Sequence, residues 1–257
     1  MNEWVHNLPV WQMALVIFAI TYLAAGGILV IVMALAKDLR LRVFKNVSIG
    51  LLSPLGVIFG LMVVFSVAEV GSDIDHANMA VDHEASAIRM VELLAASFPG
   101  EPEAQIRNLI RRHIDEAVST EWPAMAKQSA SLKVAAPALT EALKFVLSLQ
   151  PRSEGQTTAQ REIVARLENA MDARRQRIIL SRSSVNWVKW TCIFVQAGCT
   201  MFAIAAIQSD NRAAARVAMA IFATGAAVSL LLICSHDWPF SGELGIKPDV
   251  LLQVRPN

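Results

Sequence analysis

Charged residues and cysteine are both scarce in this chain of 257 residues. Only 18% of the residues are charged and 54% are hydrophobic, which is too apolar an average for one soluble domain with a solvated surface. The formal net charge of +1 leaves no excess of basic residues to attract nucleic acid. The three cysteines all lie in apolar runs, which excludes a disulfide framework and a Cys-x-x-Cys metal site; they are Cys192, Cys199 and Cys234.

The motifs of the common catalytic sites are also missing. The sequence has no Gly-x-Ser-x-Gly, no His-Glu-x-x-His, no glycine-rich phosphate loop, and no pair of carboxylates inside an apolar run. An enzyme that acts within a membrane needs ionisable groups at depth. The sequence therefore predicts a protein that is not an enzyme, has no cofactor and has no nucleic-acid partner.

Four long runs without Asp, Glu, Lys or Arg dominate the chain. They hold 33, 23, 20 and 20 residues and lie between Glu3 and Lys37, Lys45 and Glu69, Lys189 and Asp210, and Arg216 and Asp237. Each run is long enough to cross about 30 Å of hydrocarbon as a helix. Helices are favoured because lipid offers no partner to an unpaired backbone amide. We expect an integral membrane protein with four transmembrane helices in a bilayer.

The composition changes between Val70 and Trp187, where 15 of the 22 acidic and 14 of the 23 basic residues lie. Apolar residues in this stretch recur at helical spacing, which predicts a water-exposed helical domain. We expect soluble helices at about 72–98, 102–127, 134–150 and 157–185. The predicted fold is all-α, with two membrane helices on each side of this domain. The predicted segments are 1–70 with membrane helices 1 and 2, 71–186 as the extramembrane domain, 187–236 with membrane helices 3 and 4, and 237–257 as a C-terminal tail.

The orientation in a bacterial inner membrane follows less directly from the charges. Short loops rich in Lys and Arg favour the cytoplasm, and the loops 37–46 and 209–216 carry several. This bias predicts a multi-pass protein with its soluble domain on the periplasmic side. A second group of basic residues just before the third membrane helix argues for the opposite orientation, and comprises Arg174, Arg175, Arg177 and Arg182. The charges therefore do not decide on which side of the membrane the soluble domain lies.

The second membrane helix has two distinct faces at 100° per residue. One stripe runs from apolar and aromatic residues through a hydroxyl to two acids, and comprises Leu55, Phe59, Met62, Ser66, Glu69 and Asp73. This order is that of a narrow apolar constriction followed by a mouth that attracts cations. The alternative is ordinary helix packing, with the acids marking the end of the membrane segment. The other stripe is small, contains Gly56 and Gly60, and suits the close approach of a neighbouring helix.

Two histidines follow the second membrane helix in an acidic stretch. His76 and His83 are two helical turns apart, and Asp73, Asp75, Asp82 and Glu84 lie beside them. Carboxylates and imidazoles are ligands for divalent cations. Acidic residues also favour the start of a solvated helix, which is the simpler interpretation and leaves no metal site predicted.

Several short motifs occur in an order that resembles the bacterial bestrophin-like membrane protein family. They are the 2-plus-2 arrangement of membrane helices around a helical insert and the residues Ala80–Ala85, Glu121–Trp122–Pro123, Arg174–Arg175 and Pro239–Phe240–Ser241–Gly242. Each motif is short, and their order carries the resemblance, which extends from about residue 10 to the tail.

The resemblance implies a homo-oligomeric ion channel with a central pore lined by the second membrane helix of each subunit. Bestrophins proper are anion channels with a neck of aromatic and aliphatic rings, where Phe59, Met62 and Phe65 would lie. Glu69 and Asp73 depart from that pattern, because a ring of acids repels chloride. We therefore expect a closed ring of identical subunits in the lipid bilayer that conducts monovalent cations, potassium foremost. The alternatives are an anion channel and a non-conducting membrane scaffold or sensor.

Overall fold

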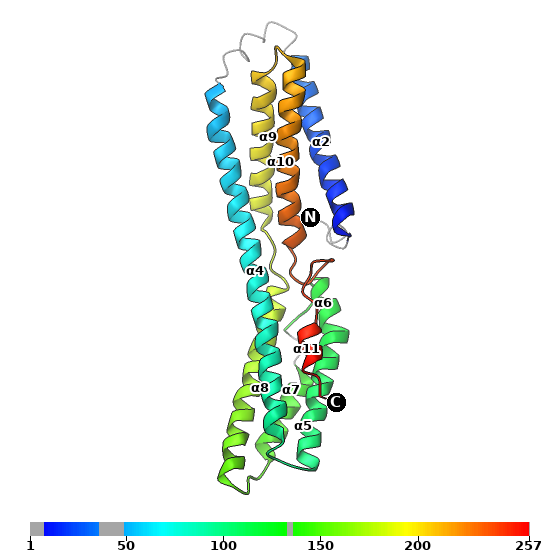
Figure 1. Cartoon of the computed structure of the whole chain (residues 1–257), viewed down its shortest axis with the longest axis vertical. Coiled ribbons are helices and arrows are strands. Elements are labelled where there is room, and N and C mark those ends of the chain that lie inside the picture. The colour runs from blue at the N-terminus through cyan, green and yellow to red at the C-terminus, as the bar shows by residue number, and fades with distance from the viewer. Residues whose placement is uncertain (1–7, 36–48, 133–135, 257) are drawn as a thin grey trace. The chain divides into compact units, whose positions relative to one another are not determined.

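The computed structural model describes residues 8–35, 49–132 and 136–256, and all regular structure in these residues is helical (Figure 1). This confirms the predicted all-α fold. In chain order the elements are α2 (Val10–Leu35), the 3₁₀ turn η1 (Ile49–Leu51), α4 (Leu52–Ala95), α5 (Glu101–Glu116), the π-helical turn η2 (Ala117–Glu121), α6 (Trp122–Ala126), α7 (Pro137–Ser148), α8 (Glu154–Leu180), α9 (Trp187–Ile207), α10 (Arg212–His236) and α11 (Asp249–Gln253). The basic loop 37–46 lies outside the described residues.

Four of these helices are long and apolar enough to cross a membrane. They are α2, the helix Ile49–Ala95 that contains α4, α9 and α10. Each overlaps one of the four charge-free runs of the sequence, and the helix Ile49–Ala95 continues well beyond its run. Asn186 and Asn211 cap the N-termini of α9 and α10, because their side chains accept hydrogen bonds from backbone amides of the first turn. The predicted arrangement of two membrane helices on each side of a helical insert is present.

The chain divides into two compact units. We call Met1–Ser72 with Ser184–Asp237 the membrane unit, and Asp73–Ser183 with Trp238–Asn257 the helical unit. The helix α4 contributes its first part to the membrane unit and the remainder to the helical unit. The C-terminal tail, which the sequence analysis treats as a separate segment, belongs to the helical unit.

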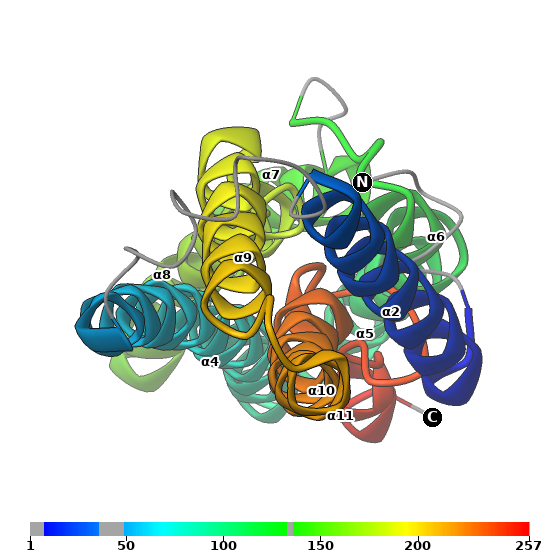
Figure 2. The ribbon, with the colours of Figure 1, turned by 90° about the horizontal axis from the view of Figure 1, so that it is seen from above.

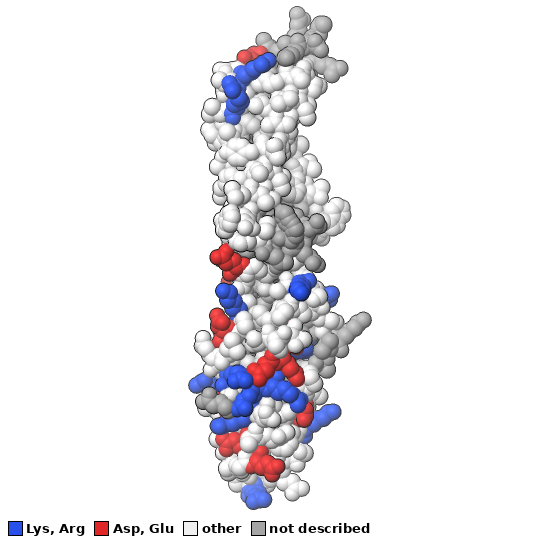
Figure 3. All heavy atoms as spheres, turned by 90° about the vertical axis from the view of Figure 1, so that its right-hand side faces the viewer, with Lys and Arg blue, Asp and Glu red and all other residues white. Residues whose placement is uncertain are grey.

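In the membrane unit, α9 and α10 lie between α4 and α2 (Figures 1 and 2). The helix α2 packs on both α9 and α10, and small side chains allow this close contact. The hydrophobic core where these three helices meet comprises Ala25, Val32, Met201, Ala205, Ala206, Met219 and Ala223. The hydroxyls of Tyr22 and Thr224 join α2 to α10 with a hydrogen bond of 2.7 Å. On the face in Figure 3, charged side chains of this unit lie near its two ends.

The helical unit is a bundle of α5, α7, α8 and the later part of α4 around a core of aliphatic side chains. Ile88, Ile110, Leu139, Ile163 and Leu167 are fully buried in this core. Pro102 lies in the first turn of α5, where its missing N–H costs nothing. Ser153 caps α8 by accepting a hydrogen bond from the backbone N–H of Gln156 at 3.2 Å.

Candidate functional site

The helix that contains α4 is longer than a bilayer is thick. Its 47 residues span about 70 Å at 1.5 Å per residue, against about 30 Å of hydrocarbon. The charge-free part ends before Glu69. The membrane-spanning segment therefore ends near Glu69, and the residues of α4 that follow it lie outside the hydrocarbon.

The predicted constriction stripe faces the other helices of the same chain. The ring of Phe59 lies 5.4 Å from that of Phe222 on α10, and both Phe59 and Ser66 are buried. The side-chain amide of Gln196 on α9 donates a hydrogen bond of 3.1 Å to the carbonyl of Leu55. Met62 is half-buried. Within one chain these residues pack α4 against its own unit, and their role as pore lining stays a prediction.

The two predicted mouth acids have partners within their own units. Glu69 forms an ion pair with Lys189 at the start of α9, so the charge of Lys189 offsets that of Glu69. The carboxylate of Asp73 accepts a hydrogen bond from the hydroxyl of Ser183. The chain thus offers less free negative charge at Glu69 than the sequence suggests.

The opposite face of the membrane part of α4 is left uncovered by its own chain. Its large apolar side chains are exposed, namely Val57, Ile58, Leu61, Val64 and Phe65. A Cβ added to Gly56 or Gly60 would meet no atom of another element within 4 Å, so no other described part of the chain approaches these two glycines closely. This free surface is available to lipid or to other copies of the chain.

The acids and histidines beyond the membrane part of α4 are exposed rather than clustered. Asp75 and Asp82 are exposed, and neither forms an ion pair with another described residue. His76 and His83 are exposed as well. Among the described residues no group of three His, Cys, Asp or Glu side chains comes together as a metal site.

A buried charged cluster lies in the core of the helical unit, and we call it the Arg177 cluster. Its residues come from α4, α5, η2, α6 and α8, and are Glu84, His113, Glu121, Trp122, Arg174 and Arg177. The Arg177 Nε atom donates to Glu84 Oε2 at 2.7 Å, and one Nη donates to Glu84 Oε1 at 3.1 Å and to Glu121 Oε2 at 2.9 Å. The guanidinium carbon lies 4.5 Å from the centre of the Trp122 ring, a cation–π distance.

The charges of this cluster balance. Glu121 Oε1 also accepts from Arg174 Nε at 2.7 Å, so two carboxylates face two guanidinium groups. Burial by itself raises the pKa of Glu84, but the charge of Arg177 and the hydrogen bond from His113 outweigh it and lower the pKa from 4.5 to about 2. Because ionised Glu84 can only accept, the His113 Nε2 atom at 2.9 Å must carry a proton and donate it.

The π-helical turn η2 explains how two adjacent residues reach this cluster. The turn inserts an extra residue between α5 and α6, and such turns are frequent at functional sites. It points Glu121 and Trp122 toward Arg177. The Trp122 indole N–H donates to the carbonyl of Ile246 at 2.9 Å, and its ring meets that of Phe240 edge to face at 5.8 Å. The C-terminal tail therefore closes the cluster.

The sequence alone did not predict the Arg177 cluster, although most of its residues lie in the short motifs named above. The four short motifs that carry the resemblance supply Glu84, Glu121 with Trp122, Arg174 and Phe240, which lie far apart in the chain. One signal for the cluster was available in the sequence. Helical periodicity places Glu84 and Arg177 on the apolar stripes of α4 and α8 that face the core, where unpaired charges are rare.

The fold and its four apolar helices define an all-helical membrane protein. The chain belongs to the Bestrophin-like family, whose domain model matches residues 19–251. No curated protein matches the chain by sequence. Crystal structures of a bacterial bestrophin homologue from Klebsiella pneumoniae share the fold. One variant aligns with a TM-score of 0.70 at 11% identity over 94% of this chain and 97% of that chain. Another aligns with a TM-score of 0.66 at 13% identity over 95% and 99% of the two chains.

Proposed function

We propose that this chain is the subunit of a homo-oligomeric ion channel in which α4 lines a central pore. The observation that carries this proposal is the uncovered surface of α4. Only 11% of its most apolar stretch is buried within the chain, against 22%, 39% and 50% for α2, α10 and α9. A ring of several copies covers one side of such a helix with a neighbour and leaves another side facing the axis. Membership in the Bestrophin-like family supports the same function.

We place the pore on the exposed face of α4, with the predicted stripe behind it. Val57, Leu61 and Val64 would then form the apolar constriction, which gates by dewetting. Phe59 and Met62 would hold α4 against α10 and set the position of that constriction. The small residues Gly56 and Gly60 would receive the neighbouring subunit.

Cation preference, with potassium as the foremost ion, is the second part of the proposal. The partner of Asp73 is a hydroxyl and not a cation, and helical periodicity places Asp75 and Asp82 on the same face of α4 as Val64. Repeated around a ring, these acids concentrate cations at the pore mouth and repel chloride. Glu69 contributes less because Lys189 offsets its charge.

Reversal potentials test the function directly. In planar bilayers under a gradient of potassium chloride, we expect the purified protein to conduct with a reversal potential close to that of potassium. A reversal potential near that of chloride would support the alternative of an anion channel. The absence of any conductance, together with a particle that is not a ring, would support a non-conducting scaffold.

The pore-facing side of α4 can be mapped by the reaction of single cysteines with a charged, water-soluble thiol reagent. In a background without the three native cysteines, we expect Val57→Cys, Leu61→Cys and Val64→Cys to react and to lose conductance. Phe59→Cys is the matched control on the buried face and should stay unreactive. Rapid block at Phe59→Cys with no reaction at Leu61→Cys would instead place the constriction on the stripe that contains Phe59 and Met62.

A further inference from the structure

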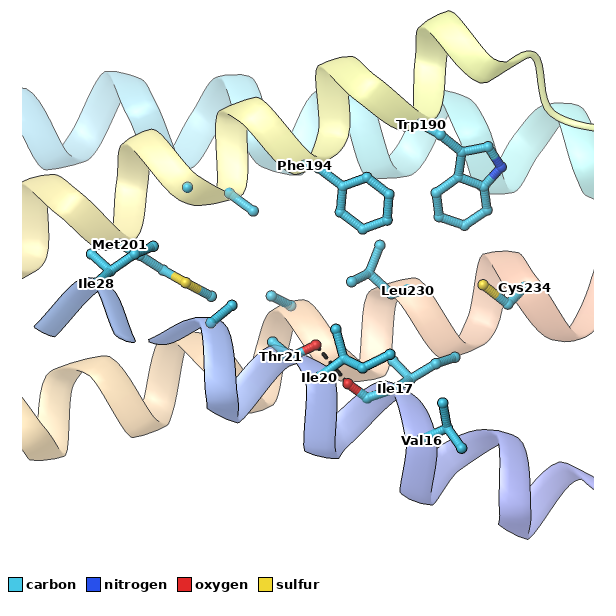
Figure 4. Close-up of a pocket in the computed structure, with 14 residues that line it drawn as sticks. Val16, Ile17, Ile20, Thr21, Ile28, Trp190, Phe194, Met201, Leu230 and Cys234 are labelled. Carbon is cyan, nitrogen blue, oxygen red and sulfur yellow. Dashed lines mark hydrogen bonds between the residues drawn. The ribbon is translucent and has the colours of Figure 1, made fainter. Parts of the chain in front are cut away.

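A cavity of about 340 Å³ lies between α2, α9 and α10 in the membrane unit (Figure 4). It arises because α2 packs closely on its partners in its later part and leans away from them toward its N-terminal end (Figure 1). Small residues on each helix enlarge the space, namely Ala24 on α2, Ala197 and Gly198 on α9, and Ala226 on α10. This cavity is separate from the exposed face of α4.

The cavity has a buried floor and an open mouth. On the floor, the side chains of Met201 and Cys234 are 3% and 2% exposed. At the mouth, Ile20 of α2 and Phe194 of α9 are 61% and 48% exposed, and Figure 4 shows these residues on opposite sides of the opening. Because these helices cross the membrane, the mouth opens toward bilayer hydrocarbon rather than toward water.

The residues that line the cavity are almost all apolar, so they offer few hydrogen-bonding partners to a polar ligand. Its hydroxyl group belongs to Thr21, which already donates a hydrogen bond of 2.8 Å to the carbonyl of Ile17 (Figure 4). Water needs two to four polar partners to occupy a cavity, and an apolar cavity of about 150 Å³ stays dry and takes up apolar molecules. An empty cavity of this size would forfeit the dispersion contacts of its lining. The occupant is therefore apolar and comes from the bilayer.

We propose that this cavity is a binding site for one acyl chain of a membrane phospholipid. The chain enters between Ile20 and Phe194 and lies along the floor formed by Met201, Leu230 and Cys234. The acyl chain moves from one apolar medium to another, so the hydrophobic effect contributes little to binding. The driving force is the van der Waals packing that is gained when methylene groups fill the void. The site is independent of ion conduction and of the proposed pore.

Photolabelling tests the assignment. The protein is reconstituted in phosphatidylcholine vesicles that contain a lipid with a diazirine on its acyl chain, irradiated and mapped by mass spectrometry. We expect adducts on the floor residues Met201, Leu230 and Cys234, which lipid at the outer surface cannot reach, in addition to adducts on outward-facing residues such as Leu15.

Matched variants separate a lipid in the cavity from lipid at the surface. Ala24→Phe places a ring in the mouth, and Ile20→Trp narrows it from a second position, so floor adducts should be lost in both while adducts on Leu15 persist. Ala19→Phe adds the same ring to an exposed position of α2 that does not line the cavity, and should leave the floor adducts unchanged.

Two results would overturn the proposal. The first is a floor free of adducts in the wild-type protein, as expected if a neighbouring copy of the chain covers the mouth. The second is a floor that is labelled equally in the wild type, Ala24→Phe and Ile20→Trp, because the label would then reach these residues by another route.

Discussion

Replacing Arg177 with methionine lowers the melting temperature of the purified protein by about 10 °C. Arg177 is fully buried and holds two carboxylates, those of Glu84 and Glu121. Removing one partner of a buried ion pair leaves an uncompensated charge and costs about 3–5 kcal/mol. In a chain of this size, each kcal/mol corresponds to about 2–4 °C. The measurement is the unfolding temperature of the detergent-solubilised protein.

A neighbouring arginine provides the matched control. Arg175 is exposed on the same helix, so Arg175→Met should change the melting temperature by less than about 2 °C. The double variant Glu84→Gln with Arg177→Met removes one charge of each sign and leaves Glu121 paired with Arg174. It should melt above the Arg177→Met single variant. A single variant that melts with the wild type would show that water, and not Arg177, neutralises these carboxylates.

Neutralising the free acids of α4 changes ion selectivity. With Asp75→Asn and Asp82→Asn, we expect the permeability ratio of potassium to chloride to fall about tenfold at low salt, because charged rings raise local ion concentrations by about 10-fold or more. The loss should shrink at high salt, where screening is strong. The measurement is the reversal potential in a potassium chloride gradient at two ionic strengths.

The ion pair between Glu69 of α4 and Lys189 of α9 supplies the control for net charge. Glu69→Gln with Lys189→Gln removes one charge of each sign and leaves the net charge of the chain unchanged. We expect its selectivity to match the wild type. An unchanged reversal potential in the Asp75 and Asp82 variant would place these acids off the ion pathway, while the channel function itself would stand.

The membrane helices and the helical insert were predictable because local chemistry determines them. Charge-free runs of 20 residues or more have no alternative to a helix in lipid, and all four appear in the structure. The insert followed from helical periodicity. Its predicted helix at 102–127 occurs as α5, η2 and α6, because the sequence carries no clear signal for a π-helical turn.

The two faces of α4 show where such reasoning stops. Periodicity assigns Phe59 and Leu61 to different faces, but both are apolar, and composition does not say which face meets the rest of the chain. The contact of Phe59 with Phe222, which is 163 positions away in the sequence, decides this. In the same way, the negative charge of Glu69 is offset by Lys189, which is distant in the sequence. The presence of an acid in a sequence does not reveal which base it pairs with.

The sequence by itself determined the membrane class, the number of membrane helices and the helical nature of the insert, because each depends on composition and spacing within one segment. Only the tertiary structure decided which side of α4 is free, and that Glu84, Glu121, Arg174 and Arg177 form one buried cluster. These charges come from three separate elements, α4, η2 and α8, and they neutralise one another only once the folded bundle brings them together and excludes water.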